Sequence, residues 1–150
     1  MKKIIVAIDL SEETKEIIDY AKNLAKSFGA KLFIVHSESV EFYINSIVNE
    51  EGVQPSVELI EKRKKIIQKQ LDEVNAEIAK DDIESECILM EGPTVDNILQ
   101  ESEKVNAELI ILGSHKHGRF YHLLFGSIHN KLIRKTHIPV MVIPTLKEKE

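Results

Sequence analysis

Residues 109–128 read LIILGSHKHGRFYHLLFGSI, and this stretch decides how the whole chain is interpreted. Four consecutive aliphatic residues, Leu109 to Leu112, lead into a segment bounded by Gly113 and Gly126, and an amphipathic run begins at Ser127. That order predicts a buried strand, a glycine-bounded loop and the start of a helix. Such loops bind phosphates, because glycine lets backbone N–H groups approach an anion and a helix N-terminus adds unpaired donors with a partial positive charge.

The composition of this loop narrows the kind of phosphate site. Lys116 and Arg119 supply mobile cations. The Walker pattern would need Gly-Lys-Ser or Gly-Lys-Thr at the helix start, and the dinucleotide pattern would need three closely spaced glycines. Neither is present, so the sequence predicts a phosphate-binding loop of another kind.

Outward from this stretch, the chain alternates strands and helices. Most of the strand-like runs are continuously apolar, which is typical of a parallel sheet covered on both faces. With four helical patterns between five runs, we expect an α/β domain, a three-layer sandwich with right-handed crossovers and helices on both faces of a five-stranded parallel sheet. The predicted strands are Ile4 to Ile8, Leu32 to His36, Glu84 to Met90, Leu109 to Leu112 and Val140 to Ile143.

The helical patterns have recognisable ends. The first is predicted to start at an N-cap, Ser11, and to stop at Gly29. The third begins at Gly92-Pro93, with proline in its first turn. The apolar residues expected to face the core are Ile17, Ile18, Ala21, Leu24, Ala25 and Phe28 in the first helix, Ile60, Ile67, Leu71, Val74 and Ile78 in the second, Val95, Ile98 and Leu99 in the third, and Ile128, Leu132 and Ile133 in the fourth.

One region has no clear period. Residues 37–56 are predicted to form a long connection with one turn of helix near 42–48, and loops of that length are often functional lids.

Length and charge limit the possible functions. The 150 residues are expected to form one domain, 1–150, and a net charge of −5 argues against nucleic-acid or anionic-membrane partners. The apolar run near the N-terminus reaches Asp9 after five residues, too short for a signal peptide, so we expect a cytoplasmic protein. The single Cys87 lies in an apolar run and is expected to be a buried, inert thiol.

Several motifs, taken in order, resemble the universal stress protein family over nearly the whole chain. They are Lys2 to Ser11, Val35-His36, Glu91-Gly92-Pro93, Ala107 to His115, Leu123 to Ser127, and Ile138 to Ile143. The resemblance implies strand order 3-2-1-4-5, a stress-response role, and a homodimer formed by pairing the last strands, Val140 to Ile143. It also implies a bound adenine nucleotide: ATP, with or without Mg²⁺, or a relative of ATP.

The resemblance also implies a set of nucleotide-binding residues. An Asp at the end of the first strand contacts the nucleoside in ATP-binding members, and Asp9 holds that position; it is equally a strand-end residue that initiates a turn. Ser37 matches a position whose backbone contacts adenine. The full predicted set is Asp9, Ser37, Leu112, Gly113, His115, Lys116, Gly126, Ser127 and Ile128. Ser127 also suits a helix N-cap, and a capping hydroxyl can donate to a phosphate.

The chain departs from the family at one position. The family pattern is Gly, two residues, Gly, nine residues, then Gly-Ser or Gly-Thr, and Lys116 stands where the second glycine belongs. A positive φ there would cost lysine about 1–2 kcal/mol. Its ammonium either binds the phosphates or fills the phosphate space, and we favour retained nucleotide binding.

Other functions fit the sequence less well. The spacing of the histidines at positions 115, 117, 122, 129 and 137 does not support a metal site strongly, so no metal site is predicted, and a weak zinc or nickel site across a dimer is the alternative. Asp9 is the one convincing acidic group at the crevice, so we expect no catalysis beyond slow ATP hydrolysis. The main alternatives are a dimeric interaction protein of the same family without nucleotide binding, and a weak ATPase. An adenylating ligase is disfavoured because the segment after the first strand, Asp9 to Glu13, is not a Ser-Gly-Gly phosphate loop.

Overall fold

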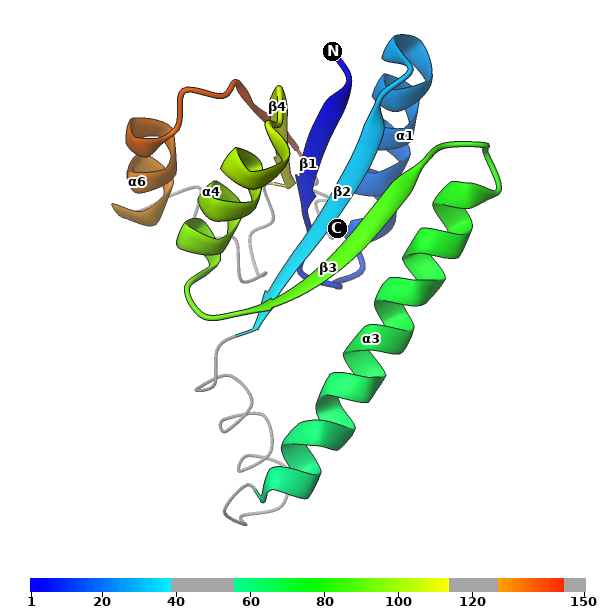
Figure 1. The fold of residues 1–150 in the computed structure, drawn as a ribbon, viewed down its shortest axis with the longest axis vertical. Coiled ribbons are helices and arrows are strands. Elements are labelled where there is room, and N and C mark those ends of the chain that lie inside the picture. The colour runs from blue at the N-terminus through cyan, green and yellow to red at the C-terminus, as the bar shows by residue number, and fades with distance from the viewer. Residues whose placement is uncertain (39–55, 114–126, 145–150) are drawn as a thin grey trace, which may run out of the picture.

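One five-stranded parallel sheet organises the protein. The computed structural model describes residues 1–38, 56–113 and 127–144, with the backbone alone for 127–130. The strands lie in the order β3-β2-β1-β4-β5, which confirms the predicted topology and places β1 at the centre. Figure 1 labels β3, β2, β1 and β4 of this sheet. Every neighbouring pair of strands is parallel.

The elements follow the predicted alternation. The strands are β1 (Lys3–Ala7), β2 (Lys31–Glu38), β3 (Ser85–Glu91), β4 (Leu109–Gly113) and β5 (Val140–Ile143). The helices of the described ranges are α1 (Thr14–Phe28), α3 (Val57–Ala79), α4 (Thr94–Val105) and α6 (Ser127–Lys135). None of these helices combines the length and the apolar character that a membrane span requires.

The prediction for the end of β2 was wrong. The strand continues two residues beyond His36, so Ser37 and Glu38 belong to it and pair with Met90 and Glu91 of β3. Both side chains are polar and buried, a pattern that sequence reasoning assigned to a loop. The rest of the predicted long connection, with its helical turn, lies in 39–55, outside the described residues.

The predicted N-cap of α1 was also wrong. The helix begins at Thr14, and Glu13 occupies the cap position without a side-chain hydrogen bond to the helix. The Ser11 amide is taken by the Asp9 carboxylate, and the Ser11 carbonyl accepts from the Thr14 amide, so a turn precedes the helix. The predicted stop is confirmed, because Gly29 adopts a φ of 65°, which favours glycine. In α4, Pro93 occupies the N-cap rather than the first turn.

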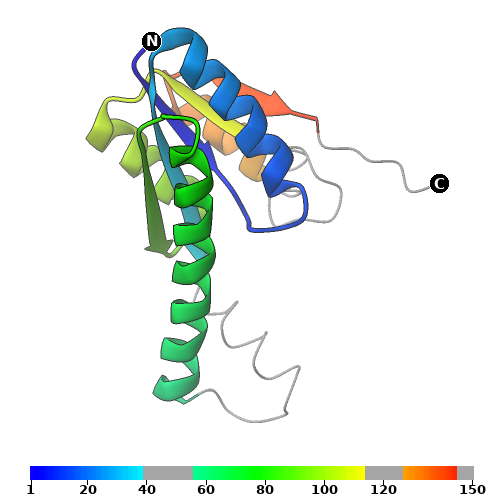
Figure 2. The ribbon, with the colours of Figure 1, turned by 90° about the vertical axis from the view of Figure 1, so that its right-hand side faces the viewer.

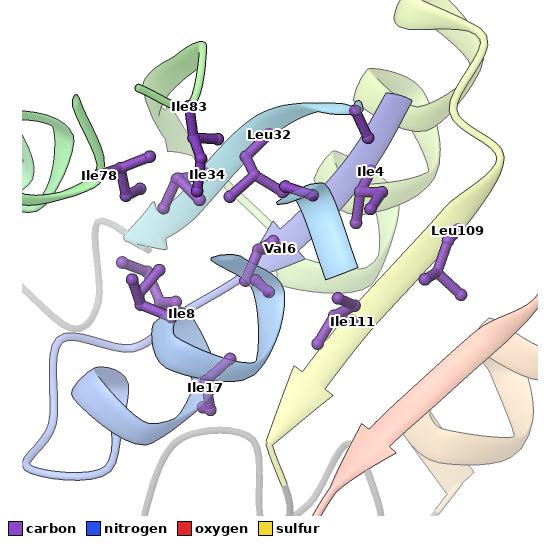
Figure 3. Packing of buried hydrophobic residues seen from close by; sticks show 14 of the residues in the cluster. Ile4, Val6, Ile8, Ile17, Leu32, Ile34, Ile78, Ile83, Leu109 and Ile111 are labelled. Carbon is purple, nitrogen blue, oxygen red and sulfur yellow. The ribbon is translucent and has the colours of Figure 1, made fainter. Parts of the chain in front are cut away.

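Helices lie on both sides of the sheet (Figure 2), and an apolar cluster lies on each face. On one face α1 and α3 pack against β1, β2 and β4, and Figure 3 shows how Ile17 and Ile78 approach the strand side chains there. On the other face α4 and α6 supply Ile98 and Leu132. Phe28 and Ile133, both expected inside, are about half exposed.

Candidate functional site

The candidate site lies at the carboxyl ends of the central strands. The chain passes from β1 to β2 and β3 on one side, and then crosses to β4 and β5 on the other. Ligands of open α/β sheets bind at such a reversal, beyond the carboxyl ends of the strands. Asp9 follows β1 by two residues and Gly113 is the last residue of β4, so the two most site-like features of the sequence lie at the carboxyl ends of neighbouring strands.

Asp9 begins a tight turn. Its Oδ1 accepts a hydrogen bond from the Ser11 amide at 3.0 Å, which is the turn-forming role considered from the sequence. Leu10, between them, has a φ of 60°, a left-handed conformation that costs a non-glycine residue about 1–2 kcal/mol. The turn is therefore held in place by its surroundings, and it presents a carboxylate at the end of the central strand.

A buried polar pair that the sequence analysis missed lies beside this turn. His36 Nδ1 lies 2.9 Å from the carbonyl oxygen of Ile8, and His36 Nε2 lies 2.7 Å from Oε1 of Glu38. Each of the two side chains is only 1% exposed. The available signal was the i, i+2 spacing of His36 and Glu38, which places both on one face of a strand.

Ser37 faces the opposite side of β2 and is buried there. Asn97 of α4 donates through Nδ2 to the Ser37 hydroxyl at 3.1 Å and to the Glu91 carbonyl at 3.0 Å. The Gly92 amide donates to the Glu38 carbonyl at 3.1 Å. These bonds tie the ends of β2 and β3 to the first turn of α4, and a sequence-based reading gave Asn97 no such role.

The β4 side of the site is described in part. Leu112 is buried, and Gly113 pairs in register with Ile143 of β5. Ser127 and Ile128 are the first residues of α6, which confirms the predicted helix start. The predicted ligands His115, Lys116 and Gly126 lie outside the described residues.

The turn after β1 is acidic and rich in hydroxyls. The hydroxyl oxygens of Ser11 and Thr14 are buried, and neither has a hydrogen-bond partner among the described residues. Glu12, Glu13 and Asp9 make the local charge negative. Such a turn suits hydroxyl groups or water better than a phosphate, whose cationic partners the sequence places after β4.

Other polar groups lie away from this edge. Lys22 and Asp81 form an ion pair of 2.5 Å beside the turn that precedes β3, at the opposite end of the sheet. Their mutual hydrogen bond raises the pKa of Lys22 and lowers the pKa of Asp81. Cys87, predicted to be buried, is only partly buried, and this burial raises its pKa to about 12, which disfavours the reactive thiolate. Among the side chains of 1–38, 56–113 and 131–144, no three metal-ligating groups cluster.

Comparison with known proteins places this geometry in a family. The model of the universal stress protein family matches residues 1–144. The chain belongs to the universal stress protein family. A universal stress protein of Thermus aquaticus is 30% identical, over 95% of this chain and 98% of its own length.

Two solved universal stress proteins share the fold. One, in complex with cAMP, superposes with a TM-score of 0.69 at 19% identity, covering 97% of this chain and 98% of its own. The other, from Archaeoglobus fulgidus in complex with dAMP, has a TM-score of 0.63 at 22% identity, covering 95% and 98%. At these identities the likeness concerns the fold.

Proposed function

We propose that this universal stress protein binds an adenine nucleotide at the carboxyl ends of β1, β2 and β4. The observation that carries the proposal is the position of Asp9 and Gly113 on adjacent strands, at the reversal of strand order. Two relatives of the same fold are in complex with cAMP and dAMP, which supports an adenine nucleotide as the ligand class. ATP, with or without Mg²⁺, is the species we expect.

The distribution of charged residues predicts how the nucleotide is oriented in the site. The Asp9 carboxylate can accept hydrogen bonds from the ribose hydroxyls. The acidic turn around it repels phosphates. The phosphates then extend toward the segment after β4, where Lys116 and the Gly126-Ser127 pair stand in the sequence. The base lies toward the end of β2, at Ser37. Leu112, Gly113, His115 and Ile128 complete the proposed contacts.

The proposed role is binding without efficient catalysis. Hydrolysis needs a carboxylate or base near the terminal phosphate, and in this orientation Asp9 lies at the nucleoside end. Glu38 is engaged by His36 and buried on the face of β2 that packs under α1 and α3. We therefore propose that this protein binds a nucleotide in the cytoplasm as part of the stress response. Its role then depends on the difference between its free and its nucleotide-bound state.

Titration calorimetry with ATP, ADP and AMP tests the proposal. Asp9→Ala is expected to weaken binding by about 1–3 kcal/mol, because a hydrogen bond to a charged group is lost. Gly126→Val is expected to weaken it by blocking backbone approach to the phosphates. Wild-type protein that binds no adenine nucleotide at millimolar concentration would favour the alternative, an interaction protein of the same family.

Lys116 tests the phosphate end of the site. If its ammonium contacts the phosphates, Lys116→Gly weakens ATP binding and reduces its salt dependence, because one cation leaves the site. This is the result that we expect. Tighter binding by the glycine variant, measured at low and high salt, would mean instead that the lysine side chain obstructs the pocket.

We also propose a homodimer through β5. This strand is the last in the sheet order and pairs only with β4 in the described ranges. Met141 and Val142 are 36% and 37% exposed, an apolar surface that a second copy of the strand would cover. Val142→Lys is expected to shift the protein toward monomer in sedimentation velocity, and a monomeric wild type at micromolar concentration would refute the dimer.

A further inference from the structure

The pair formed by His36 and Glu38 is polar, whereas the residues before it on the same face of β2 are aliphatic. Along β2, residues 32, 34, 36 and 38 face the same side of the sheet, and the first two, Leu32 and Ile34, belong to the aliphatic cluster under α1 and α3. An imidazole and a carboxyl group, each 1% exposed, continue this row. Buried groups of this kind are costly unless they satisfy each other, so their retention needs a reason.

The contacts of the pair fix its protons. A carbonyl oxygen only accepts hydrogen bonds, so His36 Nδ1 must carry a proton toward Ile8. A second proton lies between Nε2 and Oε1 of Glu38, whichever atom holds it. The pair therefore contains two protons and no net charge in either arrangement. In both arrangements the contact with Glu38 keeps a proton on Nδ1, from which the ring donates to Ile8.

The bond to Ile8 lies where the sheet ends. The last paired residues of β1 and β2 are Ala7 and Val35, and the Ile8 amide still donates to the Val35 carbonyl at 3.0 Å. The His36 side chain then donates a hydrogen bond to the Ile8 carbonyl, which belongs to the peptide bond between Ile8 and Asp9. The imidazole thus adds a hydrogen bond between the two chain segments one residue beyond the last paired residues of β1 and β2.

We propose that His36 and Glu38 form a positioning pair for Asp9. Glu38 holds the imidazole, the imidazole fixes the Ile8 carbonyl, and the fixed peptide sets the turn in which Asp9 accepts from Ser11 and Leu10 takes its left-handed conformation. The link to the nucleotide rests on the proposed function, in which Asp9 binds the ribose. Neither residue of the pair touches the ligand.

Amide hydrogen exchange tests the positioning step without any nucleotide. Glu38→Leu is expected to speed exchange at the Ser11 amide at least tenfold relative to the Ile5 amide in the middle of β1. The ratio separates a loosened turn from a general loss of stability, which would raise both rates together. Glu38→Gln, whose amide can donate to Nε2 and keep the Nδ1 proton toward Ile8, is expected to leave the ratio within twofold of wild type.

Two further variants serve as controls for the exchange experiment. Asp81→Asn weakens an ion pair at the opposite end of the sheet and is expected to leave the ratio unchanged. His36→Asn serves if Glu38→Leu does not fold, because its amide can still donate from near the Nδ1 position but loses Glu38; it is expected to raise the ratio by a smaller factor. A ratio that Glu38→Leu does not move, or that Asp81→Asn moves equally, would overturn the proposal.

A double-mutant cycle tests the link to the nucleotide. Glu38→Leu is expected to weaken ATP binding at least tenfold, and Glu38→Leu combined with Asp9→Ala is expected to bind no more weakly than Asp9→Ala alone. Additive losses would overturn the claim that Glu38 acts through Asp9. If wild-type protein binds no adenine nucleotide, the proposed function fails, and the exchange ratio still decides whether the pair positions Asp9.

Discussion

The two ends of the sheet use polar side chains in different ways. At the carboxyl end, His36 with Glu38 and Asn97 with Ser37 are buried and bind backbone groups as well as each other. At the amino end, Lys22 pairs with Asp81, and Asp81 remains 36% exposed. Lys31 there contacts Glu84 and Glu86 at 3.4 and 3.6 Å, with both carboxylates largely in solvent.

The difference separates two tasks. Solvent-exposed ion pairs contribute little to stability and tolerate small movements, so they do not fix the geometry of the elements that they join. Buried hydrogen-bonded groups are expensive to leave unpaired and therefore hold one geometry. The end of the sheet that needs a single geometry is the one where Asp9 and Gly113 lie, which fits the proposed binding site.

The largest expected effect comes from breaking the His36 pair. His36→Leu removes the imidazole that lies 2.7 Å from Glu38 Oε1, and removing one partner of a buried pair costs about 3–5 kcal/mol. Urea denaturation followed by circular dichroism measures this loss. His36→Leu with Glu38→Leu is the matched control, and the double variant is expected to be more stable than the single variant. Equal losses in both would show that the two side chains are not coupled.

Asn97 gives the second largest effect. Asn97→Leu has a similar volume but removes the donor to the Ser37 hydroxyl and the Glu91 carbonyl, at a cost of about 1–3 kcal/mol. Asn23→Leu, on the exposed face of α1, controls for the substitution itself. Melting curves of the two variants should differ by several degrees, and equal melting temperatures would contradict the structural role of the Asn97 amide.

Breaking the amino-end pair should cost less and depend on pH. The pKa of Asp81 is lowered from its ordinary 3.8, so its contribution is present above that value and is lost as the pH falls through the lower folded value. The pKa of Lys22 is raised from 10.5, so its contribution is lost as the pH rises through the higher folded value.

Asp81→Asn is therefore expected to destabilise the protein by a constant, small amount between about pH 5 and 9. The difference from wild type should shrink toward pH 3. Chemical denaturation at pH 3, 5, 7 and 9 measures it. A loss at neutral pH as large as that of His36→Leu would abolish the contrast between the two ends.

The sequence predicted what depends on local apolar patterns. The strands and their parallel packing follow from continuous aliphatic runs, because such runs indicate burial on both faces wherever they occur. The end of β2 could not be predicted this way, since Ser37 and Glu38 are polar, and an apolar pattern does not reveal partners such as Asn97 and His36 that help to satisfy them. The predicted cap failed for a different reason: the Ser11 hydroxyl has no hydrogen-bond partner among the described residues, and the Ser11 carbonyl accepts from the Thr14 amide in a turn that precedes the helix.

The site was predictable to a similar extent. Asp9 and Gly113 were found because a strand-end carboxylate and a glycine after an aliphatic run each have a local signature. Their proximity required the strand order, which came from the family resemblance. The local signal of the positioning pair, the i, i+2 spacing of His36 and Glu38, was not distinctive, because a His and a Glu two residues apart at the end of a strand also read as its exit to solvent.

The smallest effect is a change in the rate at which β3 opens, and Cys87 reports it. This residue pairs with Ile34 near the middle of β3, between the two ends compared above. Its pKa of about 12, against an ordinary 9.0, lowers the thiolate fraction at pH 8 by about a thousandfold, so iodoacetamide should label the folded protein very slowly. Denatured protein should label at the normal rate. Asn97→Leu frees the carboxyl end of β3 from α4 and is expected to speed labelling more than Asp81→Asn does, even when urea is used to match the overall stability of the two variants. Equal rates at matched stability would mean that β3 opens only when the whole domain unfolds, and that the carboxyl end of this strand is held no more tightly than the amino end.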